Sequence, residues 1–273
     1  TVARQDKASL IINNGGTAAL STGTGNDDVI INRQEGDGVN IDGGAGDDII
    51  FNFAKTVGTI KGGAGDDSIF SAGLTKGTIQ GYGADSETGN DYVRITSNMT
   101  GGDIKMGKGK NIIDAAGMTL SEVGISSTAE ATSTALLAKS ITNSTGGGKT
   151  VTINGADTAV DVATLASNLT LGAGKNSLVA DTVKEATITS TGKDTFQFKN
   201  LDDKTTIAAA GGKGSAIKIT GSAKGTTFNL GNGVNTIDAA GKTLTSVKIS
   251  DVDGAYTSVV AGAITGADGA LSK

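Results

Sequence analysis

Residues 43–51 read GGAGDDIIF, and residues 62–70 read GGAGDDSIF, so one nine-residue pattern recurs within a short distance along the chain. Two related copies are TGTGNDDVI at 22–30 and SETGNDYVR at 86–94. Aligning the sixth position of each copy places four acidic residues together, namely Asp27, Asp48, Asp67 and Asp91. Apolar residues follow the aspartates, so each glycine-rich turn leads into a short β-prone run.

The pattern continues as a lap of about 20 residues along most of the chain. Weaker turns are MGKGKNIID from Met106, LGAGKNSLV from Leu171, STGKDTFQF from Ser190, GGKGSAIKI from Gly211 and LGNGVNTID from Leu230. One lap cannot bury its own apolar face, whereas a stack of laps forms a continuous core. The sequence therefore predicts an all-β, right-handed parallel β-solenoid, a β-roll or β-helix, with about 20 residues per coil and about 11 or 12 coils.

The domain organisation follows from where the lap weakens. Residues 107–126 match residues 231–250, which indicates duplication of a larger unit. Between these copies, AEATSTALLAK (129–139) and DTAVDVATLASNL (157–169) lose the lap, and we expect small loop or helical insertions near 118–170. We predict a first solenoid over 1–126, a linker or protruding insertion over 127–150, and a second solenoid part with degenerate repeats over 151–273. The second part could also be continuous with the first.

Composition narrows the possible chemistry. The chain has no Cys and no His, which excludes disulfides, thiolate metal sites and Ser-His catalysis. Aromatic residues make up 3% of the chain and leave few platforms for stacking on sugars. The net charge is −5, and the acidic excess lies before residue 104, which favours cations over nucleic acid as partners. No apolar run is long enough for a membrane span, and we predict that the chain is not an enzyme.

The turns resemble a known calcium-binding pattern. The copies at 22–30, 43–51 and 62–70 are similar to the GGxGxDxUx nonapeptide of RTX proteins, and the copy at 86–94 fits its second half. The resemblance implies that glycine carbonyl oxygens and aspartates bind Ca²⁺ between stacked turns. It assigns the metal site to Gly23, Gly25, Asp27, Gly44, Gly46, Asp47, Asp48, Gly63, Gly65, Asp66, Asp67, Asn90 and Asp91.

Elementary electrostatics supports the same cofactor. Calcium prefers six to eight hard oxygen ligands, and carboxylates stacked about 4.8 Å apart repel unless a cation lies between them. Each lap contains one such turn, so we predict a one-sided ladder of about two to four Ca²⁺ ions. The later turns carry Lys110-Asn111, Lys175-Asn176, Lys193-Asp194 and Val234-Asn235 at the corresponding positions, and we predict that these coils are largely independent of calcium. Asp42, Asp114 and Asp238 are interpreted as turn-capping residues.

These features favour a secreted structural protein of the bacterial cell surface. The segments SLIINNGGTAAL (9–20) and YTSVVAGAITGADGAL (256–271) are β-prone and nearly uncharged, and they would leave solenoid ends open to other strands. We therefore predict a homopolymer, an extracellular filament or surface layer joined through solenoid ends or exchanged terminal strands, with a cell-surface polysaccharide as a further partner. The alternatives are the calcium-stiffened repeat region of a larger RTX adhesin or toxin and, less favoured, a polysaccharide lyase.

Overall fold

The structure, a computed structural model, describes residues 8–16, 19–23, 25–36, 38–84, 87–144, 148–211, 214–252 and 254–266. Within these ranges every regular element is a strand, and no helix occurs. The chain forms two compact units, Thr1–Lys139 (unit 1) and Ser140–Lys273 (unit 2). The predicted fold class is confirmed, because both units are parallel β-solenoids. The two units together contain about 12 coils, and each coil has roughly 21 residues.

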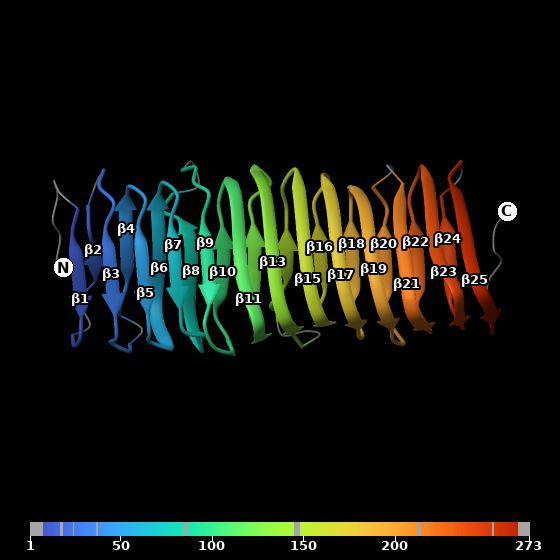
Figure 1. The fold of residues 1–273 in the computed structure, drawn as a ribbon, viewed down its shortest axis with the longest axis horizontal. Helices are drawn as coiled ribbons and strands as arrows, with labels where there is room; N and C mark the ends of the chain where they lie inside the picture. Colours follow the sequence, from blue (N-terminus) through green and yellow to red (C-terminus); the bar gives the residue numbers. More distant parts are fainter. Residues whose placement is uncertain are drawn as a thin grey trace. The chain divides into compact units, whose positions relative to one another are not determined.

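In unit 1, each coil contributes one odd-numbered and one even-numbered strand to two parallel sheets (Figure 1). The odd-numbered strands are β1 (Leu10–Asn13), β3 (Val29–Asn32), β5 (Ile49–Asn52), β7 (Ser68–Ser71), β9 (Tyr92–Ile95), β11 (Gly109–Ser121) and β13 (Ala131–Thr142). The even-numbered strands are β2 (Leu20–Ser21), β4 (Ile41–Ala45), β6 (Thr56–Ala64), β8 (Lys76–Tyr82), β10 (Asp103–Met106) and β12 (Gly124–Ser127). The division between the units lies inside the predicted 127–150 segment and within β13.

Unit 2 repeats the same two-sheet arrangement. Its even-numbered strands are β14 (Val151–Ile153), β16 (Leu169–Leu171), β18 (Thr187–Ser190), β20 (Thr206–Ala209), β22 (Thr227–Leu230) and β24 (Lys248–Asp251). Its odd-numbered strands are β15 (Asp157–Ala166), β17 (Lys175–Val183), β19 (Lys193–Leu201), β21 (Ser215–Lys224), β23 (Val234–Thr245) and β25 (Tyr256–Thr265). These odd strands are longer than those of the first coils, so the wider sheet of unit 2 needs fewer turn residues.

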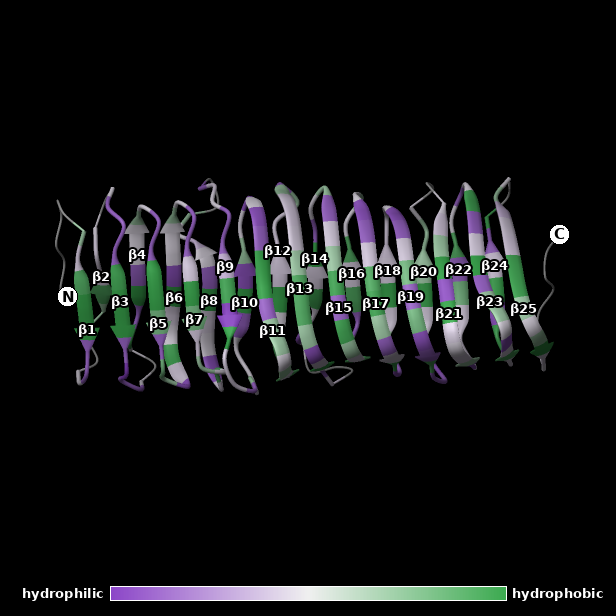
Figure 2. Cartoon of the chain, viewed as in Figure 1, coloured by the Kyte–Doolittle hydropathy of each residue, from purple (hydrophilic) through white to green (hydrophobic). Residues whose placement is uncertain are grey.

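The core of each unit is a set of apolar columns that run through successive coils. In unit 1, Ile30, Ile50 and Ile69 stand in register on the odd sheet and are fully buried. In unit 2, Phe196 and Ile217 form an equivalent pair. Side chains alternate between the core and the outer surface along the strands, and in Figure 2 the strands β1 and β3 are hydrophobic over most of their length, whereas the odd strands of unit 2 carry more hydrophilic segments.

The predicted helical insertions near 118–170 are wrong. Residues 131–142 form β13 and residues 157–166 form β15, with alternating buried and exposed side chains. Alanine and leucine gave this region a local preference for helix, but burial of Leu136, Val160 and Val162 in the stack outweighs that preference. A loop over 143–150 separates β13 from β14, and its residues 145–147 lie outside the described part of the chain.

A ladder of buried amides closes the turn that follows the odd strands of the first coils. The Nδ2 of Asn13 donates to the Oδ1 of Asn32 at 3.0 Å, and the Nδ2 of Asn32 donates to the Oδ1 of Asn52 at 2.8 Å. Asn52 in turn donates to the Oγ of Ser71 at 3.0 Å. The Asn32 amide also donates to the backbone carbonyl of Gln34 and accepts a hydrogen bond from the N–H of Gln34. Asn32 therefore links the neighbouring coils and also stabilises its own turn.

We expect Asn32→Leu to lower the free energy of unfolding by about 3 kcal/mol, because the substitution leaves several buried polar groups without partners. Denaturant unfolding followed by circular dichroism measures this loss. The matched control is Asn232→Leu at an exposed turn position, which should change stability by less than about 0.5 kcal/mol. Equal losses in the two variants would contradict a structural role for the ladder.

Candidate functional site

The glycine-rich turns between the even and odd strands of unit 1 stack directly on one another. The six predicted site glycines all have positive φ, namely Gly23, Gly25, Gly44, Gly46, Gly63 and Gly65. A Cβ on Gly63 would overlap the carbonyl oxygen of Gly44 in the preceding coil. Glycine is therefore required here by both the left-handed backbone and the close approach of adjacent turns.

The turns carry an inner column of acidic side chains that point into the solenoid. Asp48 and Asp67 are each 1% exposed, and Asp91 is 3% exposed. The backbone N–H of Asp28 donates to Asp48 Oδ1 at 2.7 Å, and that of Asp48 donates to Asp67 Oδ1 at 2.9 Å. The series continues from the N–H of Asp67 to Asp91 Oδ1 and from the N–H of Asp91 to Asn111 Oδ1. Each inner carboxylate thus holds the backbone of the coil before it.

A separate outer column runs along the solvent side of the same turns. The backbone N–H of Asp47 donates to Asp27 Oδ1 at 2.9 Å, and that of Asp66 donates to Asp47 Oδ1 at 2.8 Å. The N–H of Asn90 continues the column to Asp66 Oδ1 at 2.8 Å. Hydrogen bonds from Asn90 lower the pKa of Asp66. The acidic residues of the predicted site therefore divide between an inner and an outer column, and they do not form a single column.

The sequence alignment of the first turn is wrong by one residue. Val29 is in register with Ile49, so Asp28 stands opposite Asp48, and the buried inner column begins at Asp28. Asp27 belongs to the outer column instead. The first turn contains one residue more than the next, and aligning the glycines hid this difference. The alternation of the following strand, in which Ile30 and Ile50 are both buried, would have identified Asp28.

Two oxygens of the inner column lack hydrogen-bond partners. Asp48 Oδ2 and Asp67 Oδ2 are buried and unpaired. A Cβ on Gly43 would overlap both Asp48 Oδ2 and the carbonyl oxygen of Gly62, and a Cβ on Gly62 would overlap Asp67 Oδ2. Glycine at 43 and 62 thus makes room for these oxygens. An unpaired buried carboxylate oxygen is costly unless a proton or a cation accompanies it.

Burial dominates the electrostatics of the inner column. Burial is the main reason that the pKa of Asp48 is raised to about 7, and the carboxylates of Asp28 and Asp27 act in the same direction, against the lowering effect of the Asp28 N–H. Burial likewise raises the pKa of Asp67 to about 8 and that of Asp91 to about 7. The carboxylates of Asp91 and Asp48 contribute to the effect at Asp67. The column therefore holds negative charge poorly near neutral pH unless a positive charge joins it.

Other coils show how an uncharged side chain satisfies the same position. The Nδ2 of Asn111 donates to the carbonyl oxygen of Gly107 at 2.9 Å. Asn176 donates to Gly172 O and Asn235 donates to Gly231 O, each also at 2.9 Å. An asparagine amide thus supplies the proton that an ionised aspartate lacks. The Asp48 and Asp67 coils have an oxygen in its place.

Asp194 is the exception among the later coils, and its surroundings differ. Both of its carboxylate oxygens accept hydrogen bonds, from Asn176 and Ser190 at Oδ1 and from Ser215 at Oδ2. Burial raises the pKa of Asp194 against the lowering effect of these donors. Asp194 therefore has hydrogen-bond partners that Asp48 Oδ2 and Asp67 Oδ2 lack.

Calcium fits the donor set of the inner column. Carboxylate and carbonyl oxygens are the hard ligands that Ca²⁺ prefers, and Asp48 Oδ2, Asp67 Oδ2 and the nearby carbonyl oxygen of Gly62 are oxygens of this kind. In the structure the carboxylates form hydrogen-bonded columns, and no group of three or more acidic side chains is clustered around one point within the described ranges. Backbone carbonyls and water would have to complete the coordination of an ion there.

Two aspartates interpreted as turn-capping residues, Asp114 and Asp238, instead lie inside strands β11 and β23, where each accepts a local hydrogen bond. Asp114 Oδ1 accepts from the N–H of Ala116 at 3.0 Å, and Asp238 Oδ1 accepts from the N–H of Ala240 at 3.1 Å. These two residues occupy equivalent places in the duplicated segments 107–126 and 231–250. The duplication recognised in the sequence is therefore also a duplication of local structure.

Comparison with known proteins finds no matching family model, no matching curated protein and no matching solved structure. In the described part of the chain, no helix has the length and apolar character needed to cross a membrane. The site must therefore be interpreted from its own geometry.

Proposed function

We propose that this chain is a calcium-stiffened structural β-solenoid that binds Ca²⁺ along the inner column of unit 1 and assembles with copies of itself into an extracellular filament or surface layer of a bacterial cell. The observation that carries the proposal is the pair of buried, unpaired carboxylate oxygens, Asp48 Oδ2 and Asp67 Oδ2. A purely structural turn could use asparagine there, as other coils of this chain do.

The chain's own residues would perform the following roles. Asp48 and Asp67 would supply carboxylate oxygens, and the carbonyl of Gly62 would supply a neutral oxygen close to Asp48 Oδ2. The glycines keep this space free of side chains. A bound Ca²⁺ would supply the positive charge that keeps the carboxylates ionised and ties adjacent coils together. Ion binding would thus stabilise the first coils, where the odd strands are short.

The last described coil supports the assembly part of the proposal. Its inward-facing Ile249 and Val259 are only half-buried, whereas Phe228 and Ile237 in the preceding coil are completely buried. Another coil stacked on β24 and β25 would complete their burial, as each coil does for its predecessor. A second copy that stacks head to tail would supply such a coil.

We expect Asp48→Asn/Asp67→Asn to lower calcium affinity at least about 10-fold and to reduce the number of bound ions, because the amides satisfy the buried positions without a cation. Isothermal titration calorimetry and elemental analysis of dialysed protein measure both quantities. The matched control is Asp47→Asn/Asp66→Asn, which removes the same charge from the exposed outer column and should retain most of the binding. Unchanged stoichiometry in the inner-column variant would reject the site.

Electron microscopy of the purified protein, with calcium and with a chelator, tests assembly. Ordered fibres or sheets that form only with calcium are expected if stiffened first coils are needed for stacking. Dispersed particles in both conditions would contradict self-assembly and would instead fit the repeat region of a larger adhesin or toxin.

A further inference from the structure

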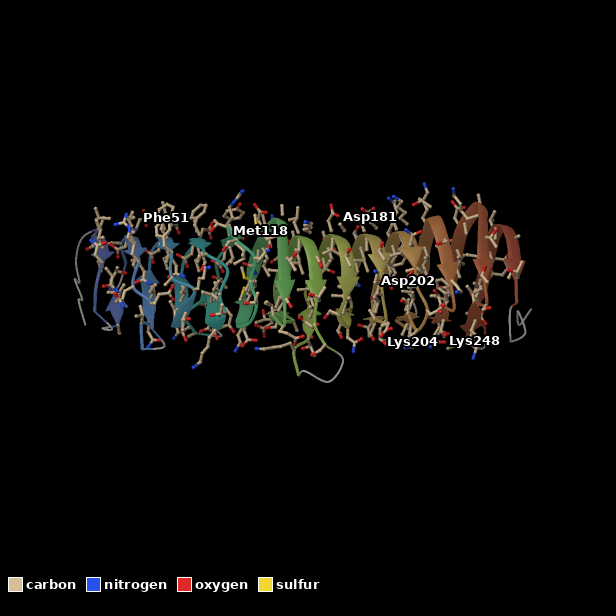
Figure 3. All side chains as sticks on the ribbon, turned by 90° about the horizontal axis from the view of Figure 1, so that it is seen from below. Phe51, Met118, Asp181, Asp202, Lys204 and Lys248 are labelled. Carbon is tan, nitrogen blue, oxygen red and sulfur yellow. The ribbon has the colours of Figure 1, made fainter. Side chains whose placement is uncertain are left out.

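The outer face of the odd sheet in unit 1 is apolar over its first coils. Two columns of outward-pointing side chains follow the strand register. One column is Leu10, Val29, Ile49, Ser68, Tyr92 and Ile112, and the other is Ile12, Ile31, Phe51, Phe70, Arg94 and Asp114. We call these two columns the apolar face. Phe51 projects outward from β5 on this face (Figure 3).

The same positions in unit 2 are mostly small or polar. The corresponding columns read Ala159, Ser177, Thr195, Ala216 and Thr236 in one case, and Asp161, Val179, Gln197, Lys218 and Asp238 in the other. Asp181, further along β17, also projects outward into solvent (Figure 3). The solenoid therefore does not require large apolar residues at these outward positions. Their accumulation in unit 1 indicates a surface that another structure covers, as both faces of parallel sheets usually are.

Side-chain packing links the apolar face across adjacent coils. The rings of Phe51 and Phe70 stack with centroids 5.1 Å apart and planes inclined by 16°, and the ring of Tyr92 lies edge-on to Phe70 at 5.9 Å. The face ends at a polar group in which Arg94 pairs with Asp114 at 3.0 Å and the Tyr92 hydroxyl donates to Asp114 at 2.7 Å. An ordered apolar sheet face of this kind can pack against another sheet face through interdigitating side chains.

The two edges of the apolar face carry different charges. The outer acidic column lies at the edge where the strands begin, with Asp27, Asp47 and Asp66 exposed. Arg33 and Lys55 lie exposed where the strands end. Glu35 also lies at that edge, but its carboxylate accepts hydrogen bonds from the backbone N–H groups of Lys55 and Thr56.

We propose that the apolar face binds the apolar face of a second copy of this chain, in an isologous pair with antiparallel strands. A two-fold axis along the direction of coil stacking places the acidic edge of one copy against the Arg33 edge of the other. This axis also sets each coil opposite its own counterpart, so Ile49 of one copy meets Phe51 of the other. The acidic edge disfavours an anionic lipid surface as the occupant.

The lateral pair extends the assembly part of the proposed function. It rests on that proposal, because its partner is a second copy of this chain. The pair itself does not depend on calcium. Head-to-tail stacking would lengthen a filament, whereas the apolar face would join two filaments side by side. A hydrophobic contact of this kind should persist in a chelator and at high salt.

Sedimentation equilibrium at about 1–100 μM protein in a chelator tests the pair. We expect the wild-type chain to dimerise and Ile49→Lys to raise the dimer dissociation constant at least about 100-fold, because a buried unpaired ammonium is costly. The control is Val179→Lys, since Ile49 is 39% exposed and Val179 is 37% exposed on the corresponding sheet of unit 2. Circular dichroism verifies that both variants fold, and Phe51→Lys provides a second variant on the face.

Disulfide trapping tests the orientation, because the wild-type chain contains no Cys. A mixture of Ile49→Cys and Phe51→Cys proteins should form crosslinked heterodimers faster than either protein alone forms homodimers. A monomeric wild-type chain throughout the concentration range, an Ile49→Lys variant that still dimerises, or equal trapping in all mixtures would overturn the proposal. Binding of the monomer to anionic vesicles would overturn it in favour of a lipid surface. Calcium stoichiometry of Asp48→Asn/Asp67→Asn, measured separately, reports only on the ion site.

Discussion

In calcium-free buffer, we expect the free energy of unfolding to fall by about 4 kcal/mol or more as the pH rises from about 4 to about 8. Burial raises the pKa of Asp48 and Asp91 to about 7 and that of Asp67 to about 8, whereas these groups ionise near 3.8 when the chain unfolds. Between these values the folded chain binds more protons than the unfolded chain. Rising pH therefore favours unfolding.

The sign of this effect distinguishes the inner column from an ordinary salt-bridged carboxylate. Stability from the three aspartates is fully present below the unfolded pKa of 3.8 and is lost as the pH rises through 7 to 8. Saturating calcium should restore the free energy of unfolding above pH 7, because the bound ion neutralises the charge of the ionised carboxylates. Calcium affinity should consequently rise with pH over the same interval.

Chemical denaturation at a series of pH values, with and without calcium, measures the expected slope. The variant Asp48→Asn/Asp67→Asn/Asp91→Asn should lose most of the slope, and Asp194, whose pKa is also raised by burial, should account for part of what remains. The control variant Asp47→Asn/Asp66→Asn should keep the wild-type slope of stability against pH, because those side chains are exposed. A wild-type stability that increases from pH 4 to pH 8 in a chelator would contradict the burial argument.

Replacing Gly63 by alanine should lower the free energy of unfolding by about 4 kcal/mol. Gly63 has φ of 124°, and a Cβ there would overlap the carbonyl oxygen and backbone of Gly44. The backbone of one turn cannot shift without moving the stacked turns around it, so the overlap cannot be relieved locally. Thermal and denaturant unfolding, read against the wild-type chain, measure the loss.

Two other glycines separate the contributions to that loss. Gly117 has φ of 78°, but no atom lies within 4 Å of the position that a Cβ would take, so Gly117→Ala should cost only about 1 kcal/mol from backbone strain. Gly15 has neither positive φ nor a neighbouring atom, and Gly15→Ala should be nearly neutral. Equal costs at Gly63 and Gly117 would show that close stacking of the turns contributes nothing.

The fold could be predicted because its main physical cause is repeated in the sequence. Apolar residues follow each acidic turn in the sequence, and the structure places Ile30, Ile50 and Ile69 of these runs in register and buries them completely. The segments 129–139 and 157–169 were predicted incorrectly because their alanines favour helix locally. Only stacking against neighbouring coils makes the strand conformation of β13 and β15 more favourable.

The arrangement of the acidic turns could be predicted only in part. The sequence indicated which turns carry stacked acidic residues, but it assigned Asp27 to the column that Asp28 begins. Spacing along a chain cannot reveal a single inserted turn residue, because glycine tolerates either backbone path. The polar ladder of Asn13, Asn32 and Asn52 was also missed, although these residues recur after the same apolar runs.

By itself, the sequence determined the solenoid, the approximate length of its coil and the position of its acidic turns, since these depend on periodic burial and on backbone freedom at glycine. Only the tertiary structure decided which carboxylates face the core and which face water. That division depends on the register of stacked strands, in which a shift of one residue moves a side chain to the opposite face. It separates Asp48 and Asp67, with their unpaired oxygens, from the solvated Asp47 and Asp66 beside them.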